Sequence, residues 1–283
     1  MSLPLIDRTT VPWTHPWPGR WRRGVVLGLP LVFGLACATV PDPATENFEK
    51  QAASHRDLGG DHLAKGNDAL ALGEFLAAAE LAPTDPQIQH GLAEAYRRQG
   101  YFPDAEQHLL NCIAWSAKDG PTKSRPTVQL ARLSLSSLYI QMERFDDAVT
   151  VSDLLVTDPT FPAPWLPLSN KGWAEYKLGK LDAARVSLGQ ALDYKHDFWR
   201  AQLNLGILES ETGDKGETLE LFDHVLAAKP GAFAEAEVHY RIGQIYVSMG
   251  QRDRAVQHLT AATQSRRSGE WGKRSEEYLK ILQ

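Results

Sequence analysis

One helical pattern recurs along most of this chain of 283 residues, and the recurrence constrains the fold more than any single motif. Residues 57–83 and 204–230 carry Leu-Gly, Gly, Phe and Pro at equivalent positions, although they lie far apart in the sequence. An Ala or Thr recurs at intervals of 34 to 43 residues, at Ala71, Ala105, Ala148, Ala184, Thr218 and Ala255. Periods of roughly 20 to 50 residues are typical of stacked repeats, none of which can bury a core alone.

Within each unit, small residues on the first helix are expected to let the second helix approach closely. These small residues are Gly59, Ala93, Ser136, Gly172, Gly206 and Gly243. The second helix supplies a larger side chain in most units, namely Phe75, Leu109, Leu188, Phe222 and Leu259, with Ser152 in the third. Glycine tolerates the left-handed backbone of a helix C-terminus, so glycines should end most first helices. The glycines at these positions are Gly66, Gly100, Gly179, Gly213 and Gly250.

This period resembles that of the tetratricopeptide repeat (TPR) over residues 52–269. The resemblance implies an all-α fold: a TPR α-solenoid of about six helix-turn-helix repeats in a right-handed superhelix, closed by a C-terminal capping helix. The expected repeats are 52–85, 86–119, 129–162, 165–198, 199–232 and 236–269, with a loop insertion at 116–126 and a capping helix at 270–283.

The N-terminal residues are read as an export signal and not as part of the repeats. Three arginines precede Gly24–Ala36, an apolar run of thirteen residues. A membrane span needs roughly 20 apolar residues, so this run is too short to be one. The stretch that ends at Cys37 resembles a bacterial lipobox. The resemblance implies a signal peptide at 1–36, a lipidated Cys37 and a linker at 37–51.

Lipidation of Cys37 would hold the chain on a membrane, because two or more fatty chains such as palmitate anchor a protein stably. Ala38 follows the cysteine, where the pattern for inner-membrane retention has Asp. The sequence therefore predicts a lipid-anchored protein on the periplasmic face of the outer membrane after signal peptide cleavage. The alternative is plain secretion with an incidental cysteine.

Charge and cysteine content narrow the range of partners. The net charge is −5 and no basic stripe occurs, which argues against nucleic acid as a partner. Cys112 is the only other cysteine, so processing at Cys37 would leave no internal disulfide. Its position in the repeat predicts a small buried side chain and not a reactive thiol.

No motif in the sequence points to catalysis, a cofactor or a metal. There is no H-E-x-x-H, no cysteine pair at metal-ligand spacing, no phosphate-binding Gly-rich loop and no G-x-S-x-G turn. His55 and His62 share one face of an expected helix, where solvated or capping side chains are the ordinary interpretation. The repeats fill almost all of the mature chain. We therefore expect a non-enzyme with no cofactor, no metal and no small-molecule substrate.

In TPR proteins the first helix of each repeat lines a concave groove, so the resemblance implies that this groove binds a protein client. The transferred register predicts a partner-binding groove lined by Arg56, His90, Glu94, Arg97, Leu130, Leu133, Ile140, Leu166, Trp173, Tyr176, Leu203, Ile207, Tyr240, Gln244 and Val247. This lining would be polar in the first two repeats and apolar or aromatic from the third, which suits a helix or an extended peptide with hydrophobic anchors. The alternative is that some of these residues pack into neighbouring helices, because a register error of one residue turns a side chain by about 100°.

The order of signal, cysteine, six repeats and short cap resembles that of the pilotin family of type IV pilus systems (the PilF/PilW/Tgl kind). The resemblance implies an outer-membrane lipoprotein that binds the secretin subunit and promotes secretin assembly for type IV pili, and hence motility. The alternative is a TPR lipoprotein that serves as a scaffold or adaptor for β-barrel assembly, peptidoglycan enzymes or a motility complex.

Overall fold

A computed structural model describes residues 43–116, 121–264 and 268–282 of the chain. The chain divides into two units, Met1–Pro41 and Asp42–Gln283, and all the described residues belong to the second unit. The expected signal peptide and Cys37 lie outside the described residues.

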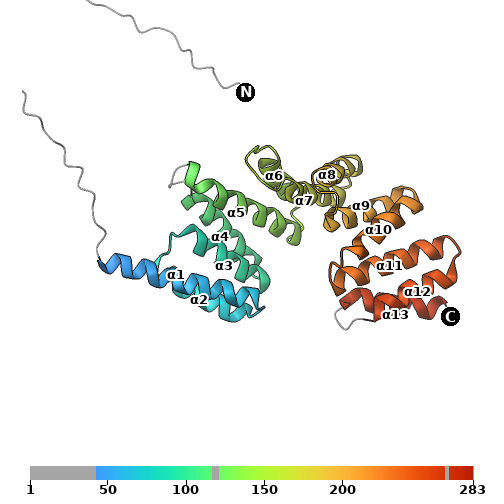
Figure 1. Cartoon of the computed structure of the whole chain (residues 1–283), viewed down its shortest axis with the longest axis horizontal. Helices are drawn as coiled ribbons and strands as arrows, with labels where there is room; N and C mark the ends of the chain where they lie inside the picture. Colours follow the sequence, from blue (N-terminus) through green and yellow to red (C-terminus); the bar gives the residue numbers. More distant parts are fainter. Residues whose placement is uncertain (1–42, 117–120, 265–267, 283) are drawn as a thin grey trace, which may run out of the picture. The chain divides into compact units, whose positions relative to one another are not determined.

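The regular structure of the described residues is entirely α-helical, and the helices follow one another in chain order (Figure 1). The helices are α1 (Pro43–Ala64), α2 (Asp68–Leu81), α3 (Pro86–Arg98), α4 (Phe102–Ser116), α5 (Pro121–Gln141), α6 (Phe145–Val156), α7 (Trp165–Lys177), α8 (Leu181–Tyr194), α9 (Trp199–Thr212), α10 (Lys215–Ala227), α11 (Ala232–Ser248), α12 (Arg252–Thr263) and α13 (Gly269–Leu282).

The helices stack in pairs. Consecutive helices contact each other along the whole series, and each odd-numbered helix from α1 to α7 also contacts the next odd-numbered helix. The last helix, α13, packs against both α11 and α12 and closes the array. The predicted all-α TPR solenoid with a C-terminal capping helix is confirmed.

Aspartate side chains cap the N-termini of two helices. The Asp85 carboxylate accepts hydrogen bonds from the backbone N–H groups of Gln87 (2.7 Å) and Ile88 (3.3 Å). Pro86 occupies the first position of α3, where a backbone N–H would have no partner within the helix. Asp214 caps α10 in the same way.

The contact between the two helices of one repeat, here called the packing seam, follows the predicted small-residue pattern. A Cβ atom added to Gly206 on α9 would lie 2.6 Å from the ring of Phe222 on α10. A Cβ added to Gly243 on α11 would lie 2.7 Å from Leu259 on α12. Both large side chains are fully buried. Glycine is therefore required at these positions unless the partner side chain moves.

Phe75 packs against two repeats. A Cβ added to Gly59 on α1 would lie 3.0 Å from its ring, and a Cβ added to Gly91 on α3 would overlap the ring even more closely. Gly91 belongs to the second repeat, and the small-residue pattern did not predict its role. The ring thus joins the first helix pair to the next one.

The glycine turns are mostly as predicted, with one exception. Positive φ angles of 71° to 82° occur at Gly66, Gly100, Gly179 and Gly250. The prediction is wrong for Gly213, whose φ of −111° and ψ of −166° are those of an extended backbone. Only Gly213 and Asp214 connect α9 to α10, so the chain leaves the helix directly in an extended conformation. In the third repeat, Glu143 takes the positive φ, at 58°.

Two segments that were expected to be irregular are helical. Residues 43–51 were expected as part of a linker, but they belong to α1. Residues 121–126 were expected as part of a loop insertion, but they form the first turns of α5. Pro121 begins this helix, and proline fixes φ close to the helical value, so a proline near a helix start is compatible with the helix.

Cys112 lies in the core that α3, α4 and α5 share, and it is fully buried, as predicted. Burial raises the pKa of its thiol to about 11, so the thiol stays protonated and unreactive near neutral pH. None of the helices in the described ranges has both the length and the apolar character that a membrane span requires.

Candidate partner-binding groove

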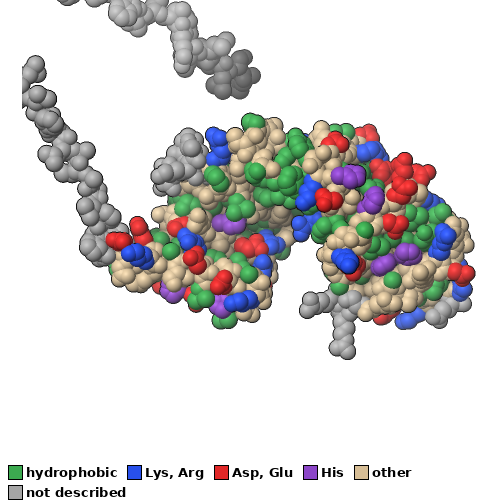
Figure 2. All heavy atoms as spheres, viewed as in Figure 1, with side chains coloured by type: hydrophobic (Ala, Val, Ile, Leu, Met, Phe, Trp, Pro, Cys, Tyr) green, Lys and Arg blue, Asp and Glu red, His purple; other side chains and the backbone are tan. Residues whose placement is uncertain are grey.

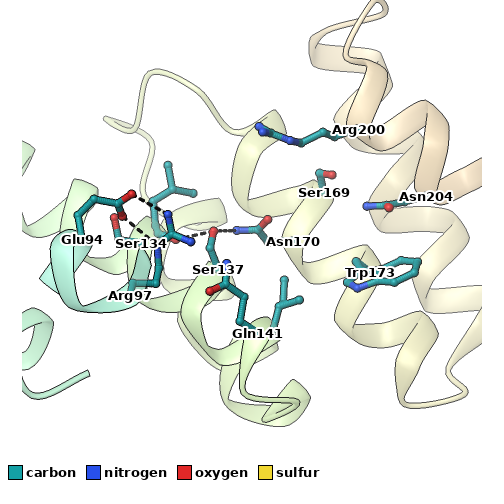
Figure 3. Close-up of a pocket in the computed structure, with 12 residues that line it drawn as sticks. Glu94, Arg97, Ser134, Ser137, Gln141, Ser169, Asn170, Trp173, Arg200 and Asn204 are labelled. Carbon is teal, nitrogen blue, oxygen red and sulfur yellow. Dashed lines mark hydrogen bonds and ion pairs between the residues drawn. The ribbon is translucent and has the colours of Figure 1, made fainter. Parts of the chain in front are cut away.

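A pocket, here called the central pocket, opens where the first helices of four successive repeats come together (Figure 3). Its volume is about 460 Å³. It is lined by Glu94 and Arg97 of α3, by Leu133, Ser134, Ser137, Ile140 and Gln141 of α5, by Ser169, Asn170 and Trp173 of α7, and by Arg200 and Asn204 of α9. Nine of these twelve side chains are polar or charged, so the pocket suits a ligand rich in hydrogen-bonding groups.

An ion pair forms the α3 side of the central pocket. Arg97 donates hydrogen bonds to both carboxylate oxygens of Glu94, at 2.6 and 2.9 Å, and Arg98 donates a third, at 3.0 Å. Burial raises the pKa of Glu94, but the hydrogen bonds from the two arginines outweigh burial and leave the pKa below its usual value. The carboxylate is therefore ionised, and two guanidinium groups balance its charge.

Hydroxyl and amide groups connect the repeats in the middle of the central pocket. The Asn170 amide donates to the hydroxyl oxygens of Ser136 (2.8 Å) and Ser137 (3.0 Å). The Nε2 atom of His90 lies 3.0 Å from the Ser134 hydroxyl. Burial lowers the pKa of His90, so its ring is neutral near pH 7. These contacts hold α3, α5 and α7 together through uncharged hydrogen bonds.

The α9 side of the central pocket carries an exposed arginine and a half-buried asparagine. Arg200 and Asn204 project from α9 toward α7 (Figure 3). The Arg200 guanidinium lies 5.0 Å from the centroid of the Trp199 ring. Within the described parts of the chain, neither Arg200 nor Asn204 forms an ion pair or a side-chain hydrogen bond. Trp173 lies beside them on α7, with its ring partly exposed and partly packed against the core cluster that contains Phe222.

The predicted groove residues fall into several places. Five of them line the central pocket: Glu94, Arg97, Leu133, Ile140 and Trp173. Arg56 and His90 line a second pocket between α1 and α3, where Arg56 donates hydrogen bonds to Asp57 and Gln87. Gln244 lines a smaller pocket formed by α9, α10 and α11.

Leu203 and Ile207 were expected on the groove, and this expectation is wrong. Both are buried in the core cluster that contains Phe222 and Ile242. The turn of α9 directs them toward α10 and α11, while other residues of α9 face the central pocket.

Leu166 and Tyr176 are half-buried against the core clusters of the fourth and fifth repeats. The Tyr176 hydroxyl donates a hydrogen bond of 2.5 Å to Glu211, and burial raises its pKa to about 12. Both residues contribute to packing between repeats, in line with the alternative interpretation of the register.

The three remaining predicted residues lie outside the central pocket. Tyr240 packs against Trp271 and Tyr278 of α13, with ring centroids 5.5 and 6.3 Å apart. Leu130 is exposed on α5, and Val247 is half-buried on α11. Charged side chains of both signs lie around the hollow beside α7 and α9 (Figure 2). The expectation of an apolar lining from the third repeat on is therefore wrong for the central pocket.

Most of the polar lining of the central pocket was not predicted from the sequence. Ser134, Asn170 and Asn204 each stand two positions before the small residue at the packing seam of their repeat. This regular spacing was a signal that could have identified them. Arg200 has no such signal, because only the structure shows which exposed arginines lack a carboxylate partner.

Several histidines contact other polar side chains, but no metal site stands out among the described residues. In the described part of the chain, no group of three or more His, Cys, Asp or Glu side chains is arranged to hold a metal. His55, which was expected to be solvated or capping, lies 2.7 Å from a Glu74 oxygen. His239 and His258 approach each other to 3.0 Å between α11 and α12.

Comparison with known proteins agrees with this architecture. Sequence models of the tetratricopeptide repeat match residues 90–124, 169–233 and 236–268. PilF of Pseudomonas aeruginosa has a similar structure, with a TM-score of 0.64 and 12% identity over 82% of this chain and 99% of PilF. PilW, described as a type IV pilus biogenesis factor, gives a TM-score of 0.64 and 15% identity over 82% of this chain and 98% of PilW.

The same fold also occurs in proteins of other kinds. MamA of Desulfovibrio magneticus RS-1 gives a TM-score of 0.51 and 18% identity over 63% of this chain and 95% of MamA. No curated protein matches the sequence. At these identities the structural likeness establishes the fold alone. The chain is thus an all-α protein built of tetratricopeptide repeats that stack as a solenoid.

Proposed function

We propose that this chain is a lipid-anchored TPR scaffold of the bacterial envelope that binds a protein client and promotes secretin assembly for type IV pili, as a pilotin. The observation that carries the proposal is the likeness to PilF and PilW, because it extends over almost the full length of both structures. A solenoid that matches only in part of its repeats would give much weaker support.

The anchor in this proposal is Cys37. Its support is the sequence alone: an apolar run, a lipobox-like stretch and a cysteine that follows directly. Acyl chains on this residue would confine the solenoid to the periplasmic face of the outer membrane. The scaffold would then meet its client at the membrane in which the client assembles.

The client-binding surface in this proposal is the central pocket. It spans the first helices of four repeats, so one client segment placed there contacts α3, α5, α7 and α9 together. The protein acts by binding and not by catalysis, in keeping with the interaction role typical of concave repeat surfaces.

The test is deletion of the gene in the bacterium that encodes it, followed by electrophoresis of the secretin under mild denaturation. We expect loss of the heat-resistant secretin multimer while the monomer is still made. Complementation with the wild-type gene should restore the multimer. An unchanged multimer in the deletion strain would contradict the pilotin role and favour a scaffold for β-barrel assembly, peptidoglycan enzymes or motility.

Two variants test the lipid anchor and the central pocket independently. Cys37→Ala should move the protein from the membrane fraction to the soluble fraction, and its retention in the membrane pellet would contradict lipidation. Trp173→Ala should lower the amount of multimer without lowering the helical content. The matched control is Tyr194→Ala, which removes an exposed aromatic ring on α8 outside the pocket. An equal effect of both ring deletions would argue against the central pocket as the surface that binds the client.

A further inference from the structure

The α9 side of the central pocket contains a cation without a counter-charge. Arg200 stacks near Trp199 and has no carboxylate partner in the described ranges of the chain, whereas most other arginines near the groove are paired. Glu94, on the opposite side of the pocket, is already held by Arg97 and Arg98. The pocket therefore has an excess of positive charge that faces its opening.

The lining of the central pocket also indicates the conformation of a ligand. Asn204 and Gln141 offer amide groups that both donate and accept, and neither has a side-chain partner outside the pocket in the described residues. An α-helix satisfies its own backbone groups, so it could offer these amides only its side chains. An extended segment presents free backbone N–H and C=O groups, which such amides can bind.

We propose that the central pocket binds an extended segment of a partner protein that carries an Asp or Glu side chain. The carboxylate pairs with Arg200, whose planar guanidinium matches a carboxylate in two-point geometry. Asn204, one helical turn further along α9, binds the backbone of the same segment, and the Trp173 ring supports it from α7. This inference rests on the proposed function and specifies the chemistry of the client.

The probes are three pools of fluorescein-labelled heptapeptides with random flanks and a central Glu, Gln or Lys. Fluorescence anisotropy with the full chain measures the affinity of each pool at low and high salt. A charge-assisted hydrogen bond at a partly exposed site should make the Glu pool bind about five- to tenfold more tightly than the Gln pool, and the Lys pool should bind most weakly. The preference should shrink at high salt.

Arg200→Gln should abolish the preference for the Glu pool over the Gln pool. The control is Arg274→Gln, which removes a guanidinium that stacks on Trp271 and pairs with Glu270 in the capping helix, outside the pocket. This control should keep the preference. Because Arg200 is exposed, its loss should not unfold the chain, and circular dichroism checks this point.

Equal binding of the Glu and Gln pools, or a preference that survives Arg200→Gln, would overturn the inference. Absence of binding by all three pools would overturn it as well. None of these results would decide the pilotin role, since loss of the secretin multimer in the deletion strain is measured independently. A fourth pool with a central Leu tests the alternative of an apolar segment. If this pool binds most tightly and Trp173→Ala weakens its binding, the pocket binds peptides but the inference of an acidic segment is wrong.

Discussion

The packing seam and the central pocket are built on the same helices, yet they follow different rules. At the seam, a glycine on one helix meets a large buried side chain on the other, and the identity of each residue is dictated by space. In the pocket, polar side chains from four helices face an open volume, and several have no partner in the described residues. Tight helix packing and the open polar pocket therefore lie on separate faces of one repeat.

The largest expected effect lies at the seam. Phe222→Ala should lower the free energy of unfolding by about 3–5 kcal/mol, because it removes a fully buried ring and leaves a cavity against Gly206. Urea unfolding followed by circular dichroism measures the loss. Val186→Ala, at an exposed position on α8, should change stability by less than about 0.5 kcal/mol. Similar losses of stability for both variants would contradict the importance of the buried ring at the packing seam.

A smaller loss is expected when the seam is overfilled. Gly206→Ala places a methyl group 2.6 Å from the Phe222 ring and should cost about 1–3 kcal/mol. Gly189→Ala is the matched control, since no atom lies within 4 Å of its added Cβ. In a helix interior this control should stabilise by about 0.5–1 kcal/mol. Thermal unfolding of both variants gives the sign of each change, and a stabilising Gly206→Ala would show that the seam has spare room.

The seam of the sixth repeat should also respond to pH. Burial lowers the pKa of both His239 and His258, and the His258 ring, 3.0 Å away, lowers the pKa of His239 further. A folded pKa below the unfolded value of about 6.5 means that the unfolded chain takes up protons first as the pH falls, so stability is lost from about pH 7 to pH 5. His239→Gln combined with His258→Gln should reduce this loss. Unfolding midpoints at the two pH values measure it, and an unchanged loss would contradict the assignment.

The smallest stability effects are expected in the pocket. Arg200→Gln and Asn204→Ala should each change the free energy of unfolding by less than about 0.5 kcal/mol, because neither side chain forms a hydrogen bond or an ion pair in the described residues. The same urea titration applies. A loss of 2 kcal/mol or more would show that these residues are structural, and it would erase the distinction between the two faces.

The sequence predicted the seam well because packing is local and periodic. Gly206 and Phe222 lie within one repeat, and their spacing recurs in other repeats, so the pattern itself reveals the contact. Most helix ends could also be predicted from the sequence. At Gly213, however, a two-residue extended connection stands in place of the expected left-handed turn. Proline-rich composition was misleading at residues 121–126, where the chain is helical.

The pocket was harder to predict because its residues come together only through stacking. Leu203 and Ile207 are apolar residues of a first helix and seemed suited to a groove, but the turn of α9 buries them between repeats. Arg200 and Asn204 lie on the same helix and face the pocket instead. A shift of one residue in the register of α9 turns its side chains by about 100°. The sequence pattern does not fix the register to one residue, so it could not decide which of the two sets faces the pocket.

The ring of Phe75 has a consequence for the end of the array. Terminal pairs of a solenoid usually fray first, since each has a neighbour on one side only. Here α1 and α2 cannot peel away without uncovering Gly91 on α3, so the amide protons of the first three helices should exchange with solvent as one block. A tether fixed at residue 37 would therefore pull on a cooperative mechanical unit and not on a loose helix.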